Sequence, residues 1–322
     1  MDGLYDAQGR HIHYLRVSVT DRCNFRCRYC MPGRDIEWLA PDQILRYEEL
    51  LRIIRVFVRL GVDKVRITGG EPLMRKNILS FLGNVAEIPG INELVLTTNG
   101  SLLEQYACGL KQAGVRRINV SLDTLNPSRF TDLAGQDQLD QVLAGLDKAQ
   151  AVGLSVKINM VVMKAVNSDE LADFAALTLQ HPYQVRFIEY MPFGSESNRL
   201  LTANEMKEQL STAGYTRLVP ETSDESVAQI YRLPGALGTI GFITPISRHF
   251  CHTCNRIRLT ADGCLKPCLL SNQEYSLREL LRSGISDSEL MIRMKDIVFH
   301  KPAQHQLDAN HKSHRTMSRI GG

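Results

Sequence analysis

Seven of the eight cysteines of this chain gather in two short segments. The first segment has the spacing C-x3-C-x2-C and the second begins with C-x2-C; together they contain Cys23, Cys27, Cys30, Cys251, Cys254, Cys264 and Cys268. Thiolates are soft ligands that suit zinc and iron–sulfur clusters. Because disulfides are rare in a reducing compartment, such clustering indicates metal or redox chemistry rather than covalent staples.

The first trio, Cys23, Cys27 and Cys30, has three interpretations on spacing alone. Zinc sites usually take cysteines in C-x2–4-C pairs, and free buried thiols rarely lie so close together. A four-iron cluster held by three cysteines keeps one iron free to bind another molecule. The spacing therefore favours an iron–sulfur cluster, while a zinc site completed elsewhere stays open.

The second segment, from Cys251 to Cys268, is evenly balanced between two kinds of metal site. Its C-x2-C pair and two later cysteines could close a tetrahedral zinc site. Three of the four thiols could equally hold a second iron–sulfur cluster, so the spacing does not decide between them.

Apolar runs of strand length alternate with helical segments over the first two thirds of the chain. The predicted strands are Leu15–Thr20, Lys64–Thr68, Glu93–Thr98, Arg116–Leu122, Val156–Met163 and Val185–Met191. The predicted helices are Asp42–Leu60, Ile78–Glu87, Leu102–Ala113, Leu139–Val152 and Ser168–Leu179. Strand–helix repeats imply right-handed crossovers and a parallel sheet. Six units are too few for a closed barrel, so we predict an α/β fold, a partial (β/α)6 TIM-type barrel, with an open doubly wound sheet as the alternative.

The pattern changes after about Thr202. A predicted helix at Ala203–Ala213 leads into further elements at Gln229–Leu233, Thr239–Thr244, Arg256–Thr260, Leu277–Leu281 and Ser286–Lys295. We therefore expect residues 1–202 to form the barrel with the first cluster. Residues 203–309 should form a C-terminal α+β extension that covers the open side and carries the second cluster, and residues 310–322 a basic tail that ends in two glycines.

The composition is that of an ordinary globular protein, with 43% hydrophobic and 23% charged residues. A net charge of +3 is too small to indicate a nucleic acid or a membrane as partner. No apolar run is long enough for a spanning helix, and the first residues lack the apolar centre of a secretion signal. A cytoplasmic protein is the expectation.

Two segments together resemble the radical S-adenosylmethionine superfamily. One is the C-x3-C-x2-C segment with Tyr29 before its last cysteine, and the other is Thr68-Gly69-Gly70-Glu71-Pro72 at the end of the next strand. The resemblance implies that the first trio holds a 4Fe–4S cluster whose free iron binds S-adenosylmethionine, which is cleaved to a 5′-deoxyadenosyl radical. By the same resemblance the cofactor contacts are Tyr29, Gly70, Ser121 and Met191.

The second cysteine segment resembles the GTP cyclase family that opens molybdenum cofactor synthesis, and this match runs from Leu15 to the closing glycines. It implies that Cys251, Cys254 and Cys268 hold a second 4Fe–4S cluster whose free iron meets the purine of GTP. Cys264 departs from the family pattern and is interpreted as an incidental thiol. The implied GTP contacts are Arg16, Arg66, Thr97, Lys157, Arg256, Ile257 and Arg258. Several inward-pointing basic residues would be costly without an anion, which agrees with a phosphate site.

The resemblance also implies an activity and partners. The chain is expected to be a lyase that converts GTP to (8S)-3′,8-cyclo-7,8-dihydroguanosine 5′-triphosphate, the first step of molybdopterin synthesis. It would take electrons from a donor such as flavodoxin and supply a cyclic pyranopterin monophosphate synthase, and a homodimer stays open. In the family the terminal glycines enter the active site beside an arginine, which points to Arg319, Gly321 and Gly322 as catalytic residues.

Two other functions are compatible with the cysteines. One is a radical enzyme with an auxiliary cluster that modifies a peptide, and the other is a non-enzymatic iron–sulfur or zinc protein. Arg256 and Arg258 between the cluster cysteines, with the Gly-Gly end, argue against the peptide enzyme.

Overall fold

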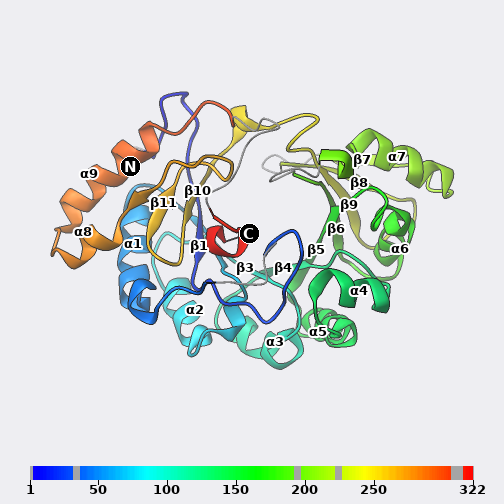
Figure 1. Cartoon of the computed structure of the whole chain (residues 1–322), viewed down its shortest axis with the longest axis horizontal. Coiled ribbons are helices and arrows are strands. Elements are labelled where there is room, and N and C mark those ends of the chain that lie inside the picture. Colours follow the sequence, from blue (N-terminus) through cyan, green and yellow to red (C-terminus); the bar gives the residue numbers. More distant parts are fainter. Residues whose placement is uncertain (1–2, 32–36, 192–196, 222–226, 306–314, 322) are drawn as a thin grey trace.

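The computed structural model describes residues 3–31, 37–191, 197–221, 227–305 and 315–321. One twelve-stranded sheet curves around a central space, with most of the helices on its outer side (Figure 1). In spatial order its strands are β12 (Tyr275–Ser276), β11 (Cys264–Lys266), β10 (Arg256–Leu259), β1 (Tyr14–Ser18), β2 (Lys64–Thr68), β3 (Glu93–Thr98), β4 (Arg117–Ser121), β5 (Ser155–Val162), β6 (Gln184–Glu189), β9 (Thr239–Ile243), β8 (Ala228–Arg232) and β7 (Val219–Glu221).

The central strands β1 to β6 are all parallel and follow one another in chain order. β10 adds to β1 and β9 adds to β6, both in parallel, so the parallel part of the sheet extends beyond the six repeated units. The sheet begins at β12 and ends at β7 without closing. The prediction of a partial barrel is thus confirmed, and the doubly wound alternative is wrong because β1 to β6 lie side by side in unbroken chain order, without the switch point of a doubly wound sheet.

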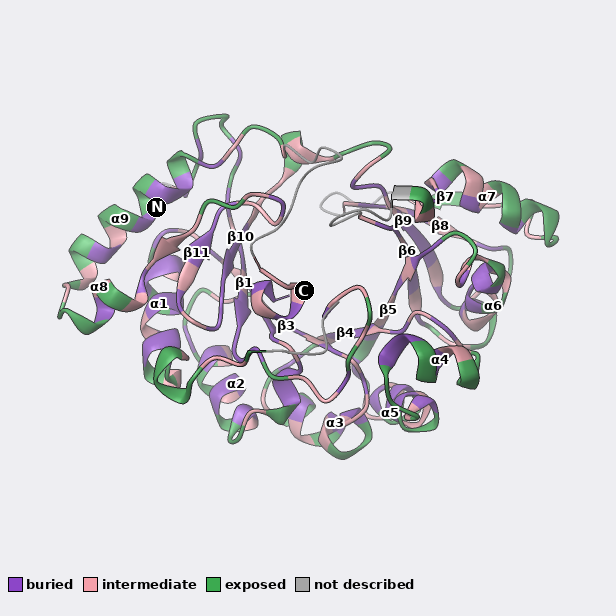
Figure 2. Ribbon diagram, viewed as in Figure 1, coloured by how far each residue is buried: buried purple, intermediate pink, exposed green. Residues whose placement is uncertain are grey.

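Helices cross over between successive strands and bury an apolar face against the sheet. They are α1 (Tyr47–Arg59), α2 (Ile78–Ala86), α3 (Leu103–Gln112), α4 (Pro127–Ala134), α5 (Leu139–Ala151) and α6 (Leu171–Gln180). In α1 the buried positions include Leu50, Ile53, Ile54 and Phe57, which recur at the spacing of one helical face. Figure 2 shows buried residues on the side of each helix that faces the strands.

The C-terminal elements extend the sheet at both of its edges. α7 (Ala203–Thr212) leads into β7, β8 and β9 beyond β6, whereas β10, β11 and β12 continue the sheet beyond β1 and are followed by α8 (Arg278–Arg282), α9 (Asp287–Phe299) and α10 (Met317–Ile320). Short 3-10 turns lie at Pro41–Gln43, Pro72–Met74, Ser168–Glu170, Ser197–Arg199 and Cys251–Thr253. In the described part of the chain, none of the helices has the length and apolar character needed to cross a bilayer. The division at residue 202 stays a prediction.

Apart from the 3-10 turns, five elements were not predicted, namely β7, β11, β12, α4 and the four-residue α10. β7, β11 and β12 have two or three residues each, which is too short for a period-2 pattern to be recognised. α4 did carry a signal, because Asn126 caps it by accepting from the backbone of Arg129 and Pro127 occupies its first turn.

A buried carboxylate joins the barrel to the extension. Glu189, at the end of β6, has no exposed surface. Its oxygens accept from the backbone of Ala203 at 3.0 Å, of Ile246 at 3.1 Å and of Ser247 at 2.9 Å, and from the Ser247 hydroxyl. The first residue of α7 and the loop after β9 are therefore held to the same strand end.

We expect Glu189→Gln to lower the free energy of unfolding by about 2 kcal/mol, because the amide turns two N–H groups toward buried donors that need an acceptor. Chemical denaturation monitored by circular dichroism measures this. The control is Glu208→Gln on the exposed face of α7, which should change stability by less than about 0.5 kcal/mol. Equal stability of the two variants would contradict this account of the joint.

Candidate active site

A cavity of about 650 Å³ lies inside the arc of strands. Inward-facing side chains of the strands and the loops at their carboxyl ends form its wall. Most residues assigned to a site from the sequence line it: Arg16, Cys23, Cys27, Tyr29, Cys30, Arg66, Gly70, Thr97, Ser121, Lys157, Met191, Cys251, Cys254, Arg256, Arg258 and Cys268. The fold therefore brings both cysteine groups and the basic residues to one place.

The first trio lies in the loop that leaves β1. The backbone N–H groups of Cys30 and Met31 both donate to the Cys27 carbonyl, at 3.0 and 2.9 Å, which makes the tight turn that carries the thiols. The backbone of Phe25 donates to the Cys23 sulfur at 3.4 Å, and the Asn99 amide does so at 3.7 Å. Burial raises the pKa of Cys23 to about 11 and that of Cys30 to about 12. Buried thiols with N–H donors aimed at sulfur fit a metal group that binds them as thiolates.

The paired glycines at the end of β2 hold the cysteine loop. Gly70 donates its N–H to the Thr20 carbonyl at 2.7 Å, and Glu71 donates to the Arg22 carbonyl at 2.8 Å. A Cβ on Gly70 would lie 2.3 Å from the Arg22 carbonyl oxygen, so no other residue fits without moving the loop. The sequence argument expected these glycines to admit a ligand; both do line the cavity, and Gly70 is also required by the neighbouring backbone.

Two buried carboxyl groups flank the first trio. Glu71 accepts from the backbone of Leu73 and Asn99 and from the Thr98 hydroxyl, and burial raises its pKa to about 7. Asp123 accepts from the Tyr29 hydroxyl and from the Val161 backbone, both at 2.8 Å, and burial raises its pKa to about 6. These bonds fix Tyr29 against the strand ends.

The second trio is assembled by the hairpin of β10 and β11. Cys251 and Cys254 precede β10, and Cys268 follows β11. Arg258 lies opposite Lys266 in these antiparallel strands. If the same register continues toward the open end of the hairpin, Cys268 lies opposite Arg256, and Arg256 is two residues after Cys254. Burial acts to raise the pKa of the Cys254 thiol, but Lys301 and Arg256 lower it, and the net shift is downward.

Cys264 lies at the other end of that hairpin. Its N–H donates to the Thr260 hydroxyl at 2.9 Å, and its sulfur accepts from Arg315 at 3.4 Å. It is absent from the cavity wall, whereas the other six clustered cysteines line it. The length of β11 separates Cys264 from Cys268, which agrees with the interpretation of Cys264 as an incidental thiol.

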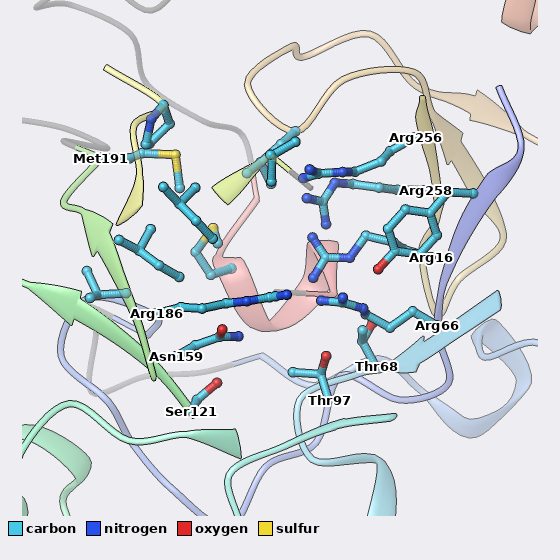
Figure 3. A pocket seen from close by; sticks show the side chains of 18 of the residues that line it. Arg16, Arg66, Thr68, Thr97, Ser121, Asn159, Arg186, Met191, Arg256 and Arg258 are labelled. Carbon is cyan, nitrogen blue, oxygen red and sulfur yellow. The ribbon is translucent and has the colours of Figure 1, made fainter. Parts of the chain in front are cut away.

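Three arginines form a row across three neighbouring strands. The register pairs Arg16 of β1 with Arg258 of β10 on one side and with Arg66 of β2 on the other. Figure 3 shows these side chains pointing into the cavity from one side and Arg186 reaching toward them from the other. Burial, together with Arg258 and Arg66, holds the pKa of Arg16 well below its usual range. Close burial of like charges is costly unless an anion joins them.

The counter-charges within the cavity do not balance this row. Glu93 pairs with Lys64 and Arg117, both at 2.5 Å. Among the described residues, Arg16, Lys157, Arg186 and Arg256 form no ion pair, and several buried polar atoms have no hydrogen-bond partner: Arg16 Nε, Thr97 Oγ1, Asn159 Oδ1 and Arg256 Nε. Burial and the charge of Arg186 lower the pKa of Lys157 to about 6. The cavity thus offers many donors to a ligand with several negatively charged oxygens.

Some predicted site residues lie elsewhere. Ile257 is fully buried in the hydrophobic core, because alternation along β10 turns it away from Arg256 and Arg258. Arg319 donates to the Glu37 carbonyl and is absent from the cavity wall. Gly321 packs at the ends of β1 and β2, and its carbonyl accepts from Arg258 at 3.3 Å. Gly322 lies outside the described residues.

Sequence reasoning missed other residues of the cavity. Arg186 lies within the predicted strand Val185–Met191 but was given no role. The polar Asn159 alternates with apolar residues along β5, a signal that could have found it. Lys301 gave no signal, since nothing in the sequence links it to the cysteines. Among the residues that the structure describes, no three His, Cys, Asp or Glu side chains gather tightly enough for a single metal ion.

Two family models together match most of the chain. Residues 17–178 match the radical SAM superfamily, and residues 183–307 match a family described as Molybdenum Cofactor Synthesis C.

Curated relatives match over the full length. The GTP 3′,8-cyclase of Heliobacterium modesticaldum is 49% identical over 99% of this chain and 100% of the relative. The GTP 3′,8-cyclase of Geobacter sulfurreducens is 46% identical over 99% of each chain.

A solved structure shares the fold. SuiB of Streptococcus suis bound to its precursor peptide SuiA has a TM-score of 0.65 at 16% identity, covering 93% of this chain and 66% of that one. At this identity the likeness concerns the fold alone.

We expect the cavity to take up about one proton when it binds tripolyphosphate near pH 8. The free Lys157 amine is neutral above its pKa of about 6, whereas phosphate oxygens restore the charged form and move the pKa back toward its ordinary value. Calorimetry in buffers of different ionisation enthalpy measures the uptake. Lys157→Met should abolish it, and uptake that persists in this variant would show that another group titrates.

Proposed function

This chain belongs to the GTP 3′,8-cyclase family of radical SAM enzymes, and from that premise we propose that it converts GTP to (8S)-3′,8-cyclo-7,8-dihydroguanosine 5′-triphosphate. This reaction is the first step of molybdenum cofactor biosynthesis. One observation carries the proposal most directly: the cavity joins two separate cysteine trios to a set of basic residues, of which Arg16, Lys157, Arg186 and Arg256 form no ion pair among the described residues. A nucleotide triphosphate supplies the missing charge.

We assign one 4Fe–4S cluster to each trio. Cys23, Cys27 and Cys30 would hold the first, and Cys251, Cys254 and Cys268 the second. When bound, the first cluster supplies the electron that cleaves S-adenosylmethionine and so provides the radical that removes hydrogen from the ribose. Three cysteines at each site leave one iron without a protein thiolate, which suits one site to the sulfonium cofactor and the other to the purine.

The basic row would bind the triphosphate. Arg16, Arg66 and Arg258 present planar guanidinium groups that match phosphate oxygens in pairs of hydrogen bonds. Each charge-assisted hydrogen bond contributes about 1.5–3 kcal/mol. The register of β10, β1 and β2 holds these groups side by side before the ligand arrives, so little side-chain ordering is required on binding. Lys157 would take up a proton when the triphosphate binds and would thereby add one positive charge to the site.

The residues around the first trio would orient the cofactor. Tyr29, Gly70, Ser121 and Met191 line the same cavity, which supports their assignment as cofactor contacts. The bond from Tyr29 to Asp123 and the bond from Gly70 to Thr20 hold two of these contacts in place. Rigid positioning matters because the radical must form within reach of the ribose and away from water.

The tail would close the site. In Figure 1, α10 lies within the arc of strands, and Gly321 reaches the ends of β1 and β2. Arg315 anchors this segment through ion pairs of 2.9 Å with Asp262 and 2.7 Å with Glu274. Gly321 is assigned a role in holding Arg258, whose guanidinium donates to its carbonyl. Arg319 and Gly322 stay in the proposal on the family resemblance alone.

The proposal extends to partners. An electron donor such as flavodoxin would reduce the first cluster, and a cyclic pyranopterin monophosphate synthase would consume the product. Cytoplasmic localisation and a homodimer belong to the same proposal.

We expect the anaerobically reconstituted protein to hold about eight irons per chain, and each trio to account for about four. Cys27→Ala should abolish 5′-deoxyadenosine formation. Cys254→Ala should keep cofactor cleavage but lose GTP consumption, because the second site no longer holds the purine. Iron analysis and chromatography of both products measure this.

Cys264→Ser is the matched control for these cysteine variants and should keep wild-type iron and turnover. Loss of iron in that variant would overturn the assigned second trio. Cofactor cleavage with no GTP consumption by the unaltered protein would overturn the cyclase activity in favour of another substrate, such as a peptide.

We expect Gly321→Ala to lower turnover at least tenfold while leaving S-adenosylmethionine cleavage without GTP unchanged. Gly321 has a φ of 79°, and an added Cβ would lie 2.6 Å from the Thr68 hydroxyl oxygen, so the tail would have to move away from the ends of β1 and β2. Steady-state assays measure both reactions. Full turnover, in this variant or after deletion of Gly321 and Gly322, would remove the tail from the mechanism.

A further inference from the structure

Lys301 is a buried lysine that lies behind the second cysteine trio. It lies two residues after the end of α9 and is only 3% exposed. Its Nζ donates to the Arg256 carbonyl at 3.0 Å and to the Pro267 carbonyl. Arg256 stands two residues after Cys254, and Pro267 stands directly before Cys268. One ammonium group therefore ties together the two chain segments that carry these cysteines.

The charge of Lys301 has no partner of opposite sign. Both of its acceptors are neutral carbonyls, and among the described residues no carboxylate lies within ion-pair distance of it. By contrast, buried Lys266 on β11 pairs with Glu274 at 2.9 Å. A buried ammonium with hydrogen bonds but no counter-charge is unfavourable unless an anionic group completes the site. The thiols of the second trio, which are carried by the segments that Lys301 ties together, are able to become such an anionic group.

Arg10 holds Lys301 and the remaining cysteine in place. One Nη of Arg10 donates to the Cys251 carbonyl at 2.7 Å and to the Ala303 carbonyl at 3.0 Å, and the other donates to the Pro302 carbonyl at 2.7 Å. Asp6 neutralises Arg10 through a bond of 2.6 Å. The chain segments of all three cysteines are thus hydrogen-bonded to a buried cation, either Arg10 or Lys301. The charge of Arg10 is balanced by Asp6, whereas that of Lys301 is not balanced by any carboxylate of the described residues.

We propose that Lys301 is a positioning residue of the second metal site that also offsets the negative charge of its metal–thiolate group. It clamps the open end of the β10–β11 hairpin, so that Cys254 and Cys268 converge. Its charge stabilises the more negative, reduced state of a bound cluster, and so raises the reduction potential there.

The first trio has acidic neighbours, in contrast to the second. Buried Glu71 and half-buried Asp123 lie beside the first trio, and among the described residues no buried cation binds its cysteine segments in the same way. The two clusters assigned under the proposed function would therefore differ in electrostatic setting as well as in ligand. The inference rests on that function for the identity of the metal group.

The test uses full-length protein in which Cys23, Cys27 and Cys30 are all alanine, so that only the second site is loaded. Lys301→Met keeps the aliphatic stem but removes the charge and the clamp. We expect its metal to pass to a chelator about tenfold faster, and the midpoint potential of its cluster to shift to a more negative value. Lys301→Arg should restore the potential, because it returns the charge.

Lys266→Met is the matched control, since it removes a buried lysine from the same hairpin whose charge Glu274 already balances. It should lower thermal stability without moving the potential. A potential and chelator rate in Lys301→Met equal to those of the parent, or an equal shift in Lys266→Met, would overturn the inference.

The outcome stays distinct from that of the proposed function. If the parent protein holds zinc at this site, the assigned cluster fails, and the chelator rate of Lys301→Met still decides whether Lys301 supports the metal. A zinc site released at the same rate with and without Lys301 would overturn both.

Discussion

Positive charge buried inside the barrel without a matching carboxylate is the constraint on which the rest of this structure depends. The interior of a closed TIM barrel is usually filled by layers of apolar side chains. Here the same layers contain arginines and lysines, and Glu93 pairs with only two of the cavity's basic residues, Lys64 and Arg117. The sheet stays open and keeps a cavity of about 650 Å³ where those layers would otherwise pack. A polyanionic ligand would offset the positive charge that the carboxylates of the cavity do not balance.

The strands and the cysteines could be predicted from the sequence because their signals are local. Each of the six barrel strands was predicted within about two residues of its bounds, since apolar runs mark buried parallel strands. The first trio and the Gly-Gly segment were recognised as parts of one site through their resemblance to the radical S-adenosylmethionine superfamily. Both follow strands of a parallel sheet, and such ends meet at one edge. The paired arginines of β10, β1 and β2 were named, but their common row depends on register, which no single strand reveals.

What the sequence could not reveal depends on contacts between distant segments. Lys301 meets Pro267 and Arg256 only after α9 has returned the chain to the sheet. The extension was expected to cover the open side of the barrel. Its strands lengthen the sheet at both edges, because β1 and β6 offer backbone hydrogen-bonding groups there that the six barrel strands leave free. Ile257 was grouped with its arginine neighbours, although period-2 alternation along β10 turns it into the core. The contact of Ile257 with GTP stays a prediction.

The arginine row also bears on how reliably the chain folds. A slip of β1 by one residue would turn Arg16 toward the helices and bring Leu15 and Val17 into the cavity. That arrangement would bury a guanidinium against α1 and expose two core side chains to water, so misregistered sheets lie far above the native one in free energy. The arginines assigned to nucleotide binding thus also favour the native register of the strands during folding, before any ligand is present.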